Sequence, residues 1–249
     1  QRPLQRPLPV TVPSSAPGGD IIVHVFGRTD VGRTREHNED CFVIADLTTM
    51  NATLQPEVRE HRLGVRGSLF MVADGMGGAA AGEIASQMAT EVVLEDIDAR
   101  WRHAEATDAD AFALALRASV ETVNTRIHRF ALEHPEYRGM GTTTTVAGII
   151  GDTLYLCQVG DSRGYLIRDG VATQITKDQS LVQRLIDAGE LTPEEAEVSE
   201  RRNIILQALG PEASVKVDLT VQQLRRGDTL MLCSDGLSGL VRIDDIARL

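Results

Sequence analysis

Acidic residues stand beside apolar, strand-like runs at four places in this 249-residue chain. The apolar run from Leu69 to Ala73 ends at Asp74, and three of the next four residues are glycines. Asp161 and Asp235 each follow another apolar run, again close to a glycine. An acidic pair also precedes a fourth run. The full set of acids is Glu39, Asp40, Asp74, Asp161 and Asp235.

Such a pattern predicts a site for divalent cations. If the strands lie side by side, up to five carboxylates converge, and their mutual repulsion requires cations nearby. Oxygen ligands without neighbouring Cys or His pairs suit Mg²⁺ or Mn²⁺ better than zinc. Each segment also has an ordinary alternative when it is taken singly. Asp74 could cap a helix at a strand-turn-helix corner, and the acids near residue 40 could form ion pairs on a surface loop.

Glycines and an arginine accompany these acids. The glycines after Asp74 let the backbone turn sharply and leave its carbonyls and amides open to a ligand. Arg35 lies just upstream of the acidic pair, and its planar guanidinium can donate paired hydrogen bonds to a phosphate. His37 is interpreted as a loop residue, because no second histidine is spaced to join it as a metal ligand.

Composition limits the class of protein. With 42% hydrophobic residues, the chain can bury a substantial core, and we predict one folded domain over residues 20 to 249. The net charge of -11 argues against nucleic acid or an anionic membrane as the main partner. No apolar run is long enough to cross a bilayer, and no secretory signal is visible. We therefore expect a cytoplasmic monomer, with Cys41, Cys157 and Cys233 reduced and buried.

Residues 1–19 have a different composition from the rest. They hold five of the nine prolines and repeat Gln-Arg-Pro-Leu twice. This composition predicts a disordered tail or linker. Because the chain does not start with methionine, we expect it to be a piece of a longer protein that the tail tethers to a neighbouring domain.

The elements that position the acids can be read from hydrophobic periodicity. A first helix is predicted from Ala81, with a core-facing stripe of Ile84, Met88 and Val92. A second has its stripe at Phe112, Leu116, Val120, Val123, Ile127 and Phe130. The pair is expected to cover one face of a sheet. Predicted strands span residues 21–26, 41–45, 69–73, 146–150, 154–159, 164–167, 171–175, 215–221 and 228–233.

Two short turns make the sheet antiparallel. Gly151-Asp152 and Asp169-Gly170 each separate two apolar runs by two residues, which predicts tight hairpins. Residues 177–210 are more polar and predict a helical flap, in which Thr192 caps a helix and Pro193 occupies its first turn. The predicted fold class is α+β, with helices outside antiparallel sheets.

Five segments, in order, resemble one known family. They are Arg35-Glu36-His37-Asn38-Glu39-Asp40, Val72-Ala73-Asp74-Gly75-Met76-Gly77-Gly78, Gly139-Met140-Gly141-Thr142-Thr143, Val159-Gly160-Asp161-Ser162-Arg163 and Cys233-Ser234-Asp235-Gly236-Leu237. Together they are similar to the bacterial metal-dependent serine/threonine protein phosphatases of the PPM (type 2C) family, over residues 20 to 249. The resemblance implies a four-layer α-β-β-α sandwich with a binuclear metal centre at one end.

The resemblance also implies roles for individual residues. Asp74 would bridge two ions of Mn²⁺ or Mg²⁺, with one of them ligated by the Gly75 carbonyl and the other by Asp235. Asp161 would share a third, weaker ion with Asp235. Glu39 and Asp40 would hold metal-bound waters, and Arg35 would bind the substrate phosphate. A metal-activated hydroxide would then hydrolyse phosphoserine or phosphothreonine in proteins, without a covalent phosphoenzyme. The expected partners are phosphorylated proteins and a cognate serine/threonine kinase.

Two departures from the family pattern affect this interpretation. Ala79 stands where bacterial members usually have histidine, so no role of that histidine is transferred. The sequence also stops at Leu249, before the Asp-Asn motif and final strand that would complete the metal site. The resemblance therefore implies a truncated phosphatase whose isolated chain binds metal weakly. The alternative from another class is a catalytically degenerate module that binds a phosphorylated partner as a regulator.

Overall fold

The computed structural model describes residues 21–51, 60–102, 104 and 108–248, so the tail expected over residues 1–19 lies outside the described residues. The elements in chain order are β1 (Ile22–His24), β2 (Asp40–Asp46), β3 (Glu60–Arg62), β4 (Ser68–Met76), α1 (Ala79–Ile97), η1 (Asp98–Arg102), α2 (Ala109–Glu133), η2 (Pro135–Tyr137), β5 (Gly141–Thr142), β6 (Thr144–Ile150), β7 (Thr153–Val159), β8 (Arg163–Arg168), β9 (Val171–Gln174), α3 (Leu181–Asp187), α4 (Pro193–Glu197), β10 (Asp218–Gln223), β11 (Thr229–Cys233), α5 (Asp235–Ser238) and α6 (Ile243–Ile246).

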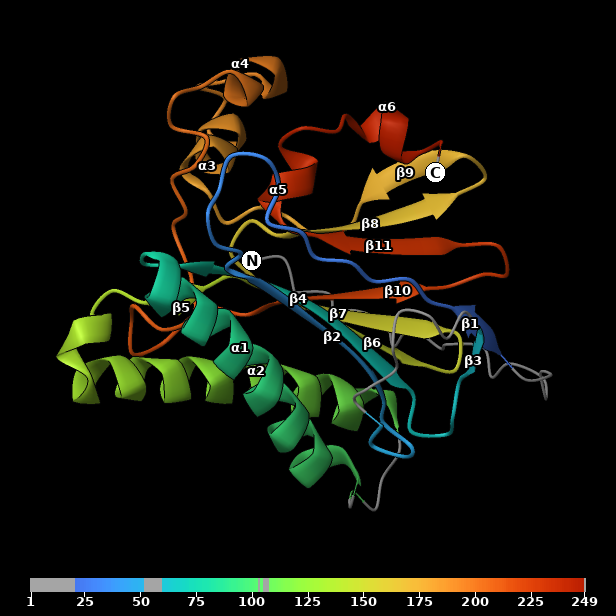
Figure 1. The fold of residues 1–249 in the computed structure, drawn as a ribbon. Coiled ribbons are helices and arrows are strands. Elements are labelled where there is room, and N and C mark those ends of the chain that lie inside the picture. The colour runs from blue at the N-terminus through green and yellow to red at the C-terminus, as the bar shows by residue number, and fades with distance from the viewer. Residues whose placement is uncertain (1–20, 52–59, 103, 105–107, 249) are drawn as a thin grey trace, which may run out of the picture.

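The strands form two stacked antiparallel sheets and a separate ribbon (Figure 1). The larger sheet has the order β10-β7-β6-β4-β2, with β5 paired to the end of β4. The smaller sheet has the order β11-β8-β9, and β1 pairs with β3. The strands on either side of Gly151-Asp152 and of Asp169-Gly170 pair directly across those residues, which confirms both predicted hairpins.

Three clusters of buried side chains separate four layers. The largest lies between the larger sheet and the helices α1 and α2, which cover its outer face (Figure 1). A second, built around Ile149 and Leu156, also includes Leu232 and fills the space between the sheets. The third joins the smaller sheet to α6 through Tyr165 and Ile246. The expected α-β-β-α sandwich is therefore confirmed. Among the described residues, no helix is both long and apolar enough to cross a membrane.

The predicted helices are correct in type, and the buried face of the first differs from the prediction. In α2, the six expected stripe residues are buried or pack against the core. In α1, the buried apolar residues on the first three turns are Ala81, Ala85 and Ala89. Of the predicted stripe, Val92 is buried, whereas Ile84 and Met88 are only partly buried. Alanine lets the helix axis approach the sheet closely, so the larger residues pack along the margin of the contact.

Several element boundaries also differ from the predictions. The strand β4 does not end at Ala73 but runs on to Met76, so Asp74 lies within the ladder. The helix α1 begins at Ala79 with Gly78 as its N-cap and no side-chain cap, which contradicts the alternative of Asp74 as a helix cap. β10 begins three residues later than predicted. In the flap region, Thr192 and Glu195 form a capping box with Pro193 at the start of α4, as expected.

Candidate functional site

Asp74 is fixed in the larger sheet at a point where the backbone is held from both sides. It lies opposite Asp40 in the antiparallel register of β2 and β4. Its carbonyl accepts hydrogen bonds from the Thr143 amide at 2.8 Å and from the Thr142 hydroxyl at 2.9 Å. Its own amide donates to the Thr143 hydroxyl at 3.2 Å. Thr142 at the end of β5 and Thr143 just before β6 therefore set the position from which the Asp74 carboxylate projects.

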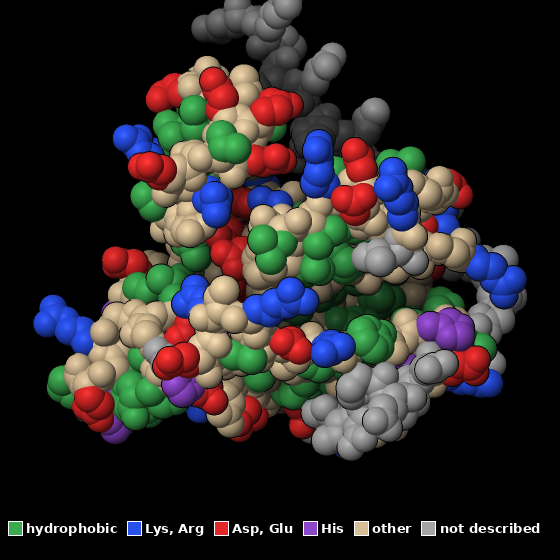
Figure 2. Space-filling model, turned by 45° about the horizontal axis from the view of Figure 1, so that its top comes forward, with side chains coloured by type: hydrophobic (Ala, Val, Ile, Leu, Met, Phe, Trp, Pro, Cys, Tyr) green, Lys and Arg blue, Asp and Glu red, His purple; other side chains and the backbone are tan. Residues whose placement is uncertain are grey.

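Asp161 and Asp235 come from the smaller sheet. Cys233 at the end of β11 pairs with Arg163 at the start of β8, so the two acids extend from the same end of neighbouring strands. Asp235 opens the short helix α5, and Asp161 occupies the loop between β7 and β8. The two sheets thus bring their acids to a common edge. In the space-filling view, acidic side chains gather in a recess between the lobe of α3 and α4 and the rest of the molecule (Figure 2).

Burial and like charges show how closely these carboxyl groups interact. Burial and the charge of Asp40, followed by the other two acids, raise the pKa of Asp74 to about 8. A hydrogen bond with the Asp235 side chain contributes to the same shift. Burial and the charges of Asp235 and Asp178 raise the pKa of Asp161 to about 6. A proton or a cation is needed here to relieve the repulsion.

The donor set suits an oxygen-preferring divalent cation. The carboxylates come from Asp40, Asp74, Asp161 and Asp235, and no cysteine or histidine accompanies them in the interactions described above. Within the described part of the chain, no three His, Cys, Asp or Glu side chains already form a close metal-binding group. The structure therefore brings four of the five predicted acids, namely Asp40, Asp74, Asp161 and Asp235, into one interacting group, and the ligand assigned to each ion stays a prediction.

Glu39 and Asp40 are held by contacts that sequence reasoning missed. The Gly75 amide donates to the Glu39 carbonyl at 3.1 Å. The Ser234 hydroxyl donates to the Asp40 carboxylate at 2.7 Å, across 194 positions of sequence. Ser234 thereby ties the end of the smaller sheet to the larger one. The only signal for it in the sequence was its place immediately before Asp235.

A second missed feature is the close approach of the first turn of α1 to β4. A Cβ atom on Gly75 would lie 2.1 Å from the Gly82 carbonyl oxygen. One on Gly82 would lie 2.9 Å from the Gly75 carbonyl carbon and 3.0 Å from the Glu39 carboxyl carbon. Two glycines are needed for this contact, and it keeps the Gly75 backbone next to Glu39. A glycine inside a helical pattern was the available signal.

Arg35 stands apart from the acids. It lies exposed on the loop before β2 and has no ion pair with another residue that the structure describes. Arg163, in contrast, is held by Asp178, with Nη2 and Oδ2 2.7 Å apart. Arg163 is thus committed to an internal ion pair, whereas the guanidinium of Arg35 is accessible to a ligand from solution.

Comparison with known proteins identifies the family. A family model described as protein phosphatase 2C matches residues 58–248. The chain belongs to this family. Among its relatives, the serine/threonine phosphatase stp of Listeria monocytogenes serovar 1/2a is 39% identical over 220 residues, which are 88% of this chain and 79% of the relative. The serine/threonine protein phosphatase PstP of Mycobacterium tuberculosis H37Rv is 39% identical over 228 residues, which are 91% of this chain and 38% of the relative.

Solved structures of protein phosphatase 2C relatives have the same fold. The serine/threonine phosphatase from S. agalactiae aligns with a TM-score of 0.75 and 33% identity, over 92% of this chain and 85% of that one. The catalytic domain of PstP, solved in complex with two manganese ions, aligns with a TM-score of 0.71 and 37% identity, over 92% and 84%. The family match includes Asp74, Asp161 and Asp235, while Arg35 and the Glu39-Asp40 pair precede it.

Proposed function

We propose that this chain is a metal-dependent protein phosphatase that hydrolyses phosphoserine and phosphothreonine in proteins with Mn²⁺ or Mg²⁺. The observation that carries the proposal is the half-buried Asp74, whose pKa is raised to about 8 by burial and by neighbouring carboxylates from both sheets. A site of this kind binds divalent cations because they remove the repulsion. Membership of the protein phosphatase 2C family supports the reaction class.

We assign the metal-binding roles as the family resemblance implies them. Asp74 would bridge two ions, one of them also bound by the Gly75 carbonyl and the other by Asp235. Asp161 would share a third ion with Asp235. When bound, such ions would lower the pKa of a water molecule that serves as the nucleophile and would neutralise charge on the phosphate.

The remaining roles belong to the protein itself. Arg35 would bind two phosphate oxygens through its paired donors. Glu39 and Asp40 would orient water molecules, and the hydrogen bond from Ser234 keeps Asp40 directed at the site. Phosphorylated proteins are the proposed substrates. We further propose a cytoplasmic, monomeric enzyme that has a cognate serine/threonine kinase as a partner.

Hydrolysis of a phosphothreonine peptide, followed with Mn²⁺ and with a chelator, tests the proposal. We expect Mn²⁺-dependent release of phosphate, and a loss of at least about 100-fold in Asp74→Asn, because the substitution removes one anionic oxygen from the bridging position. Asp244→Asn, an exposed carboxylate on α6, is the matched control. Turnover by Asp74→Asn within a few-fold of the parent would contradict the assigned role. Binding of the peptide by the unaltered protein without any turnover would favour the regulatory module instead.

A further inference from the structure

Two glutamines surround the loop that carries Asp161. Gln179 is hydrogen-bonded to both the amide and the carbonyl of Gly160, the residue that precedes Asp161. The Gly160 amide donates to the Gln179 side-chain oxygen at 2.9 Å, and the backbone amide of Gln179 donates to the Gly160 carbonyl at 2.9 Å. Both backbone polar groups of Gly160 are therefore held by one residue. Gly160 itself has φ of 103°, which favours glycine, so its backbone needs these outside contacts to stay in one conformation.

Gln158 is hydrogen-bonded to the same loop. Its side chain is buried, with an exposed fraction of 2%. The side-chain nitrogen lies 3.2 Å from the Gly160 carbonyl and 3.3 Å from the Ser162 carbonyl, and donates to both. Its side-chain oxygen accepts from the Lys177 amide at 3.1 Å. Asp161 thus lies between two residues whose carbonyls accept hydrogen bonds from Gln158. Through the Lys177 amide, the same glutamine also contacts the segment that leads to Gln179.

The other half of the Gln179 side chain points to β10. Its nitrogen donates to the Asp218 carboxylate at 2.8 Å and to the Lys216 carbonyl at 3.3 Å. Its backbone carbonyl accepts from the Leu206 amide at 2.8 Å. Gln179 therefore joins three parts of the molecule: the Asp161 loop, the edge of the larger sheet and the chain near residue 206.

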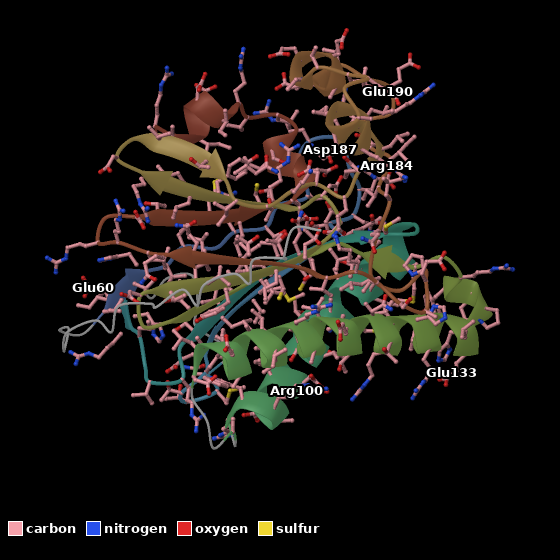
Figure 3. All side chains as sticks on the ribbon, turned by 180° about the vertical axis from the view of Figure 1, so that it is seen from behind. Glu60, Arg100, Glu133, Arg184, Asp187 and Glu190 are labelled. Carbon is pink, nitrogen blue, oxygen red and sulfur yellow. The ribbon has the colours of Figure 1, made fainter. Side chains whose placement is uncertain are left out.

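These contacts lie at the root of the flap. We call residues 181–204, with α3 and α4, the lobe. It enters and leaves the molecule through adjacent segments, where Ser180 bridges to Ile205 and the Leu181 amide donates to the Ile204 carbonyl at 2.9 Å. Arg184, Asp187 and Glu190 lie on the lobe, on the opposite side of the molecule from α1 and α2 (Figure 3). Gln179 lies directly beyond this bridge, because it precedes Ser180 and its carbonyl accepts from the Leu206 amide, which follows Ile205.

We infer that Gln179 is a positioning residue that couples the lobe to Asp161. In this role it holds the Asp161 loop in the geometry needed for the ion that Asp161 and Asp235 would share, and it transmits a change in the lobe to that ion. The inference rests on the proposed metal-dependent function. Its structural half, the link between the lobe root and the Asp161 loop, can be measured without metal.

The first experiment replaces the polar end of Gln179. Gln179→Met keeps the length of the side chain and removes its side-chain hydrogen bonds, while the backbone ones remain. Gln183→Met on α3 is the matched control, since that side chain bonds to Asp187 alone among the residues that the structure describes. In metal-free protein, hydrogen exchange should become faster at the amides of Gly160 and Leu206 in Gln179→Met and stay unchanged in Gln183→Met. Calorimetry with Mn²⁺ should show about 10–100-fold weaker binding of the ion that is lost in Asp161→Ala, with the other ions retained.

A rescue experiment separates positioning from a general loss of packing. Gln179→Glu keeps an acceptor for the Gly160 amide but sets a second carboxylate against Asp218. Adding Asp218→Asn supplies an amide donor, so the donor and acceptor of this contact exchange places. We expect Gln179→Glu to weaken the Asp161-dependent ion and the double variant to recover it. This comparison holds even if Gln179→Met does not fold.

The outcomes distinguish the two proposals. Unchanged exchange at Gly160 and Leu206 in Gln179→Met, or no recovery in the double variant, would overturn the coupling. If the unaltered protein binds no Mn²⁺, the proposed metal-dependent function fails, and the exchange rates still decide whether Gln179 links the lobe to the Asp161 loop.

Discussion

Arg35 and Arg163 differ in whether their guanidinium groups are already engaged in an ion pair, and the difference yields a prediction for substrate binding. Arg163 is paired with Asp178, whereas Arg35 is exposed on the loop before β2. Arg35→Ala should raise KM for a phosphorylated peptide about 10- to 100-fold, because a charge-assisted hydrogen bond contributes about 1.5–3 kcal/mol. kcat should change less. Steady-state kinetics provide the measurement, and Arg33→Ala on the same loop is the control. Equal KM values for Arg35→Ala and the parent would make Arg35 an ordinary loop residue.

At the scale of residues, the sequence predicted the acids better than their supports. Asp74 and Asp235 could be singled out because each follows an apolar run in the sequence, a local signal that needs no knowledge of the fold. Ser234 contacts Asp40 across 194 positions of sequence. Gly82 in the first turn of α1 lies against Gly75 in β4. Both contacts depend on how the elements pack. Gln179 carries no local signal of this kind in the sequence. Its role depends on Gly160 and Asp218, which only the fold brings together.

Helix α2 packs on the larger sheet through an aromatic contact that leaves no room for a side chain at Gly148. Phe112 is fully buried, with its ring 5.0 Å from that of Trp101 and 5.3 Å from that of Tyr155. A Cβ atom on Gly148 would lie 2.4 Å from the Phe112 ring. Gly148→Ala should therefore lower the free energy of unfolding by about 1–3 kcal/mol through overpacking. Urea denaturation of Gly148→Ala, Phe112→Leu and the double variant measures this. The glycine substitution should cost less when the ring is absent, and an equal cost in both backgrounds would exclude the clash.

At the scale of elements, local turn chemistry was predictable, and the buried face of α1 was predictable only in part. The hairpins at Gly151-Asp152 and Asp169-Gly170 follow from two-residue turns, and the structure has both. The buried face of α1 was predicted from Ile84, Met88 and Val92. Val92 is buried as predicted, but Ile84 and Met88 are only partly buried, whereas Ala85 and Ala89 are fully buried. Periodicity ranks residues by hydrophobicity, whereas close packing of a helix on a sheet selects for small size. Sequence alone therefore predicted that α1 covers the sheet and that Val92 is buried, and it missed the alanines at the centre of the buried face.

At the scale of the whole molecule, folding brings the site's carboxylates together and so creates electrostatic repulsion between them. Asp40 and Asp74 come from the larger sheet, and Asp161 and Asp235 from the end of the smaller one. Packing the two sheets brings these charges together in a chain whose net charge is already -11. The hydrophobic clusters between the layers hold the acids in place. Protons or divalent cations at the site should consequently stabilise the fold as well as serve its chemistry.

This coupling predicts how stability changes with pH. Folding raises the pKa of Asp74 to about 8 and that of Asp161 to about 6, each from an ordinary value of 3.8. Between about pH 4 and pH 8 the folded state therefore binds more protons than the unfolded state, so the free energy of unfolding decreases as pH rises. Without metal, Tm should fall from pH 5 to pH 8, and Asp74→Asn should flatten that slope, with Asp244→Asn as control.

Addition of Mn²⁺ should reverse the trend. Because the ions compete with protons for the same carboxylates, Mn²⁺ should raise Tm more at pH 8 than at pH 5, and it should do so much less in Asp74→Asn. Thermal unfolding at the two pH values, with a chelator or with Mn²⁺, provides the four numbers needed for each variant. If the metal-free protein became more stable toward pH 8, or if Mn²⁺ stabilised it equally at both pH values, the carboxylates would not form the interacting site described above.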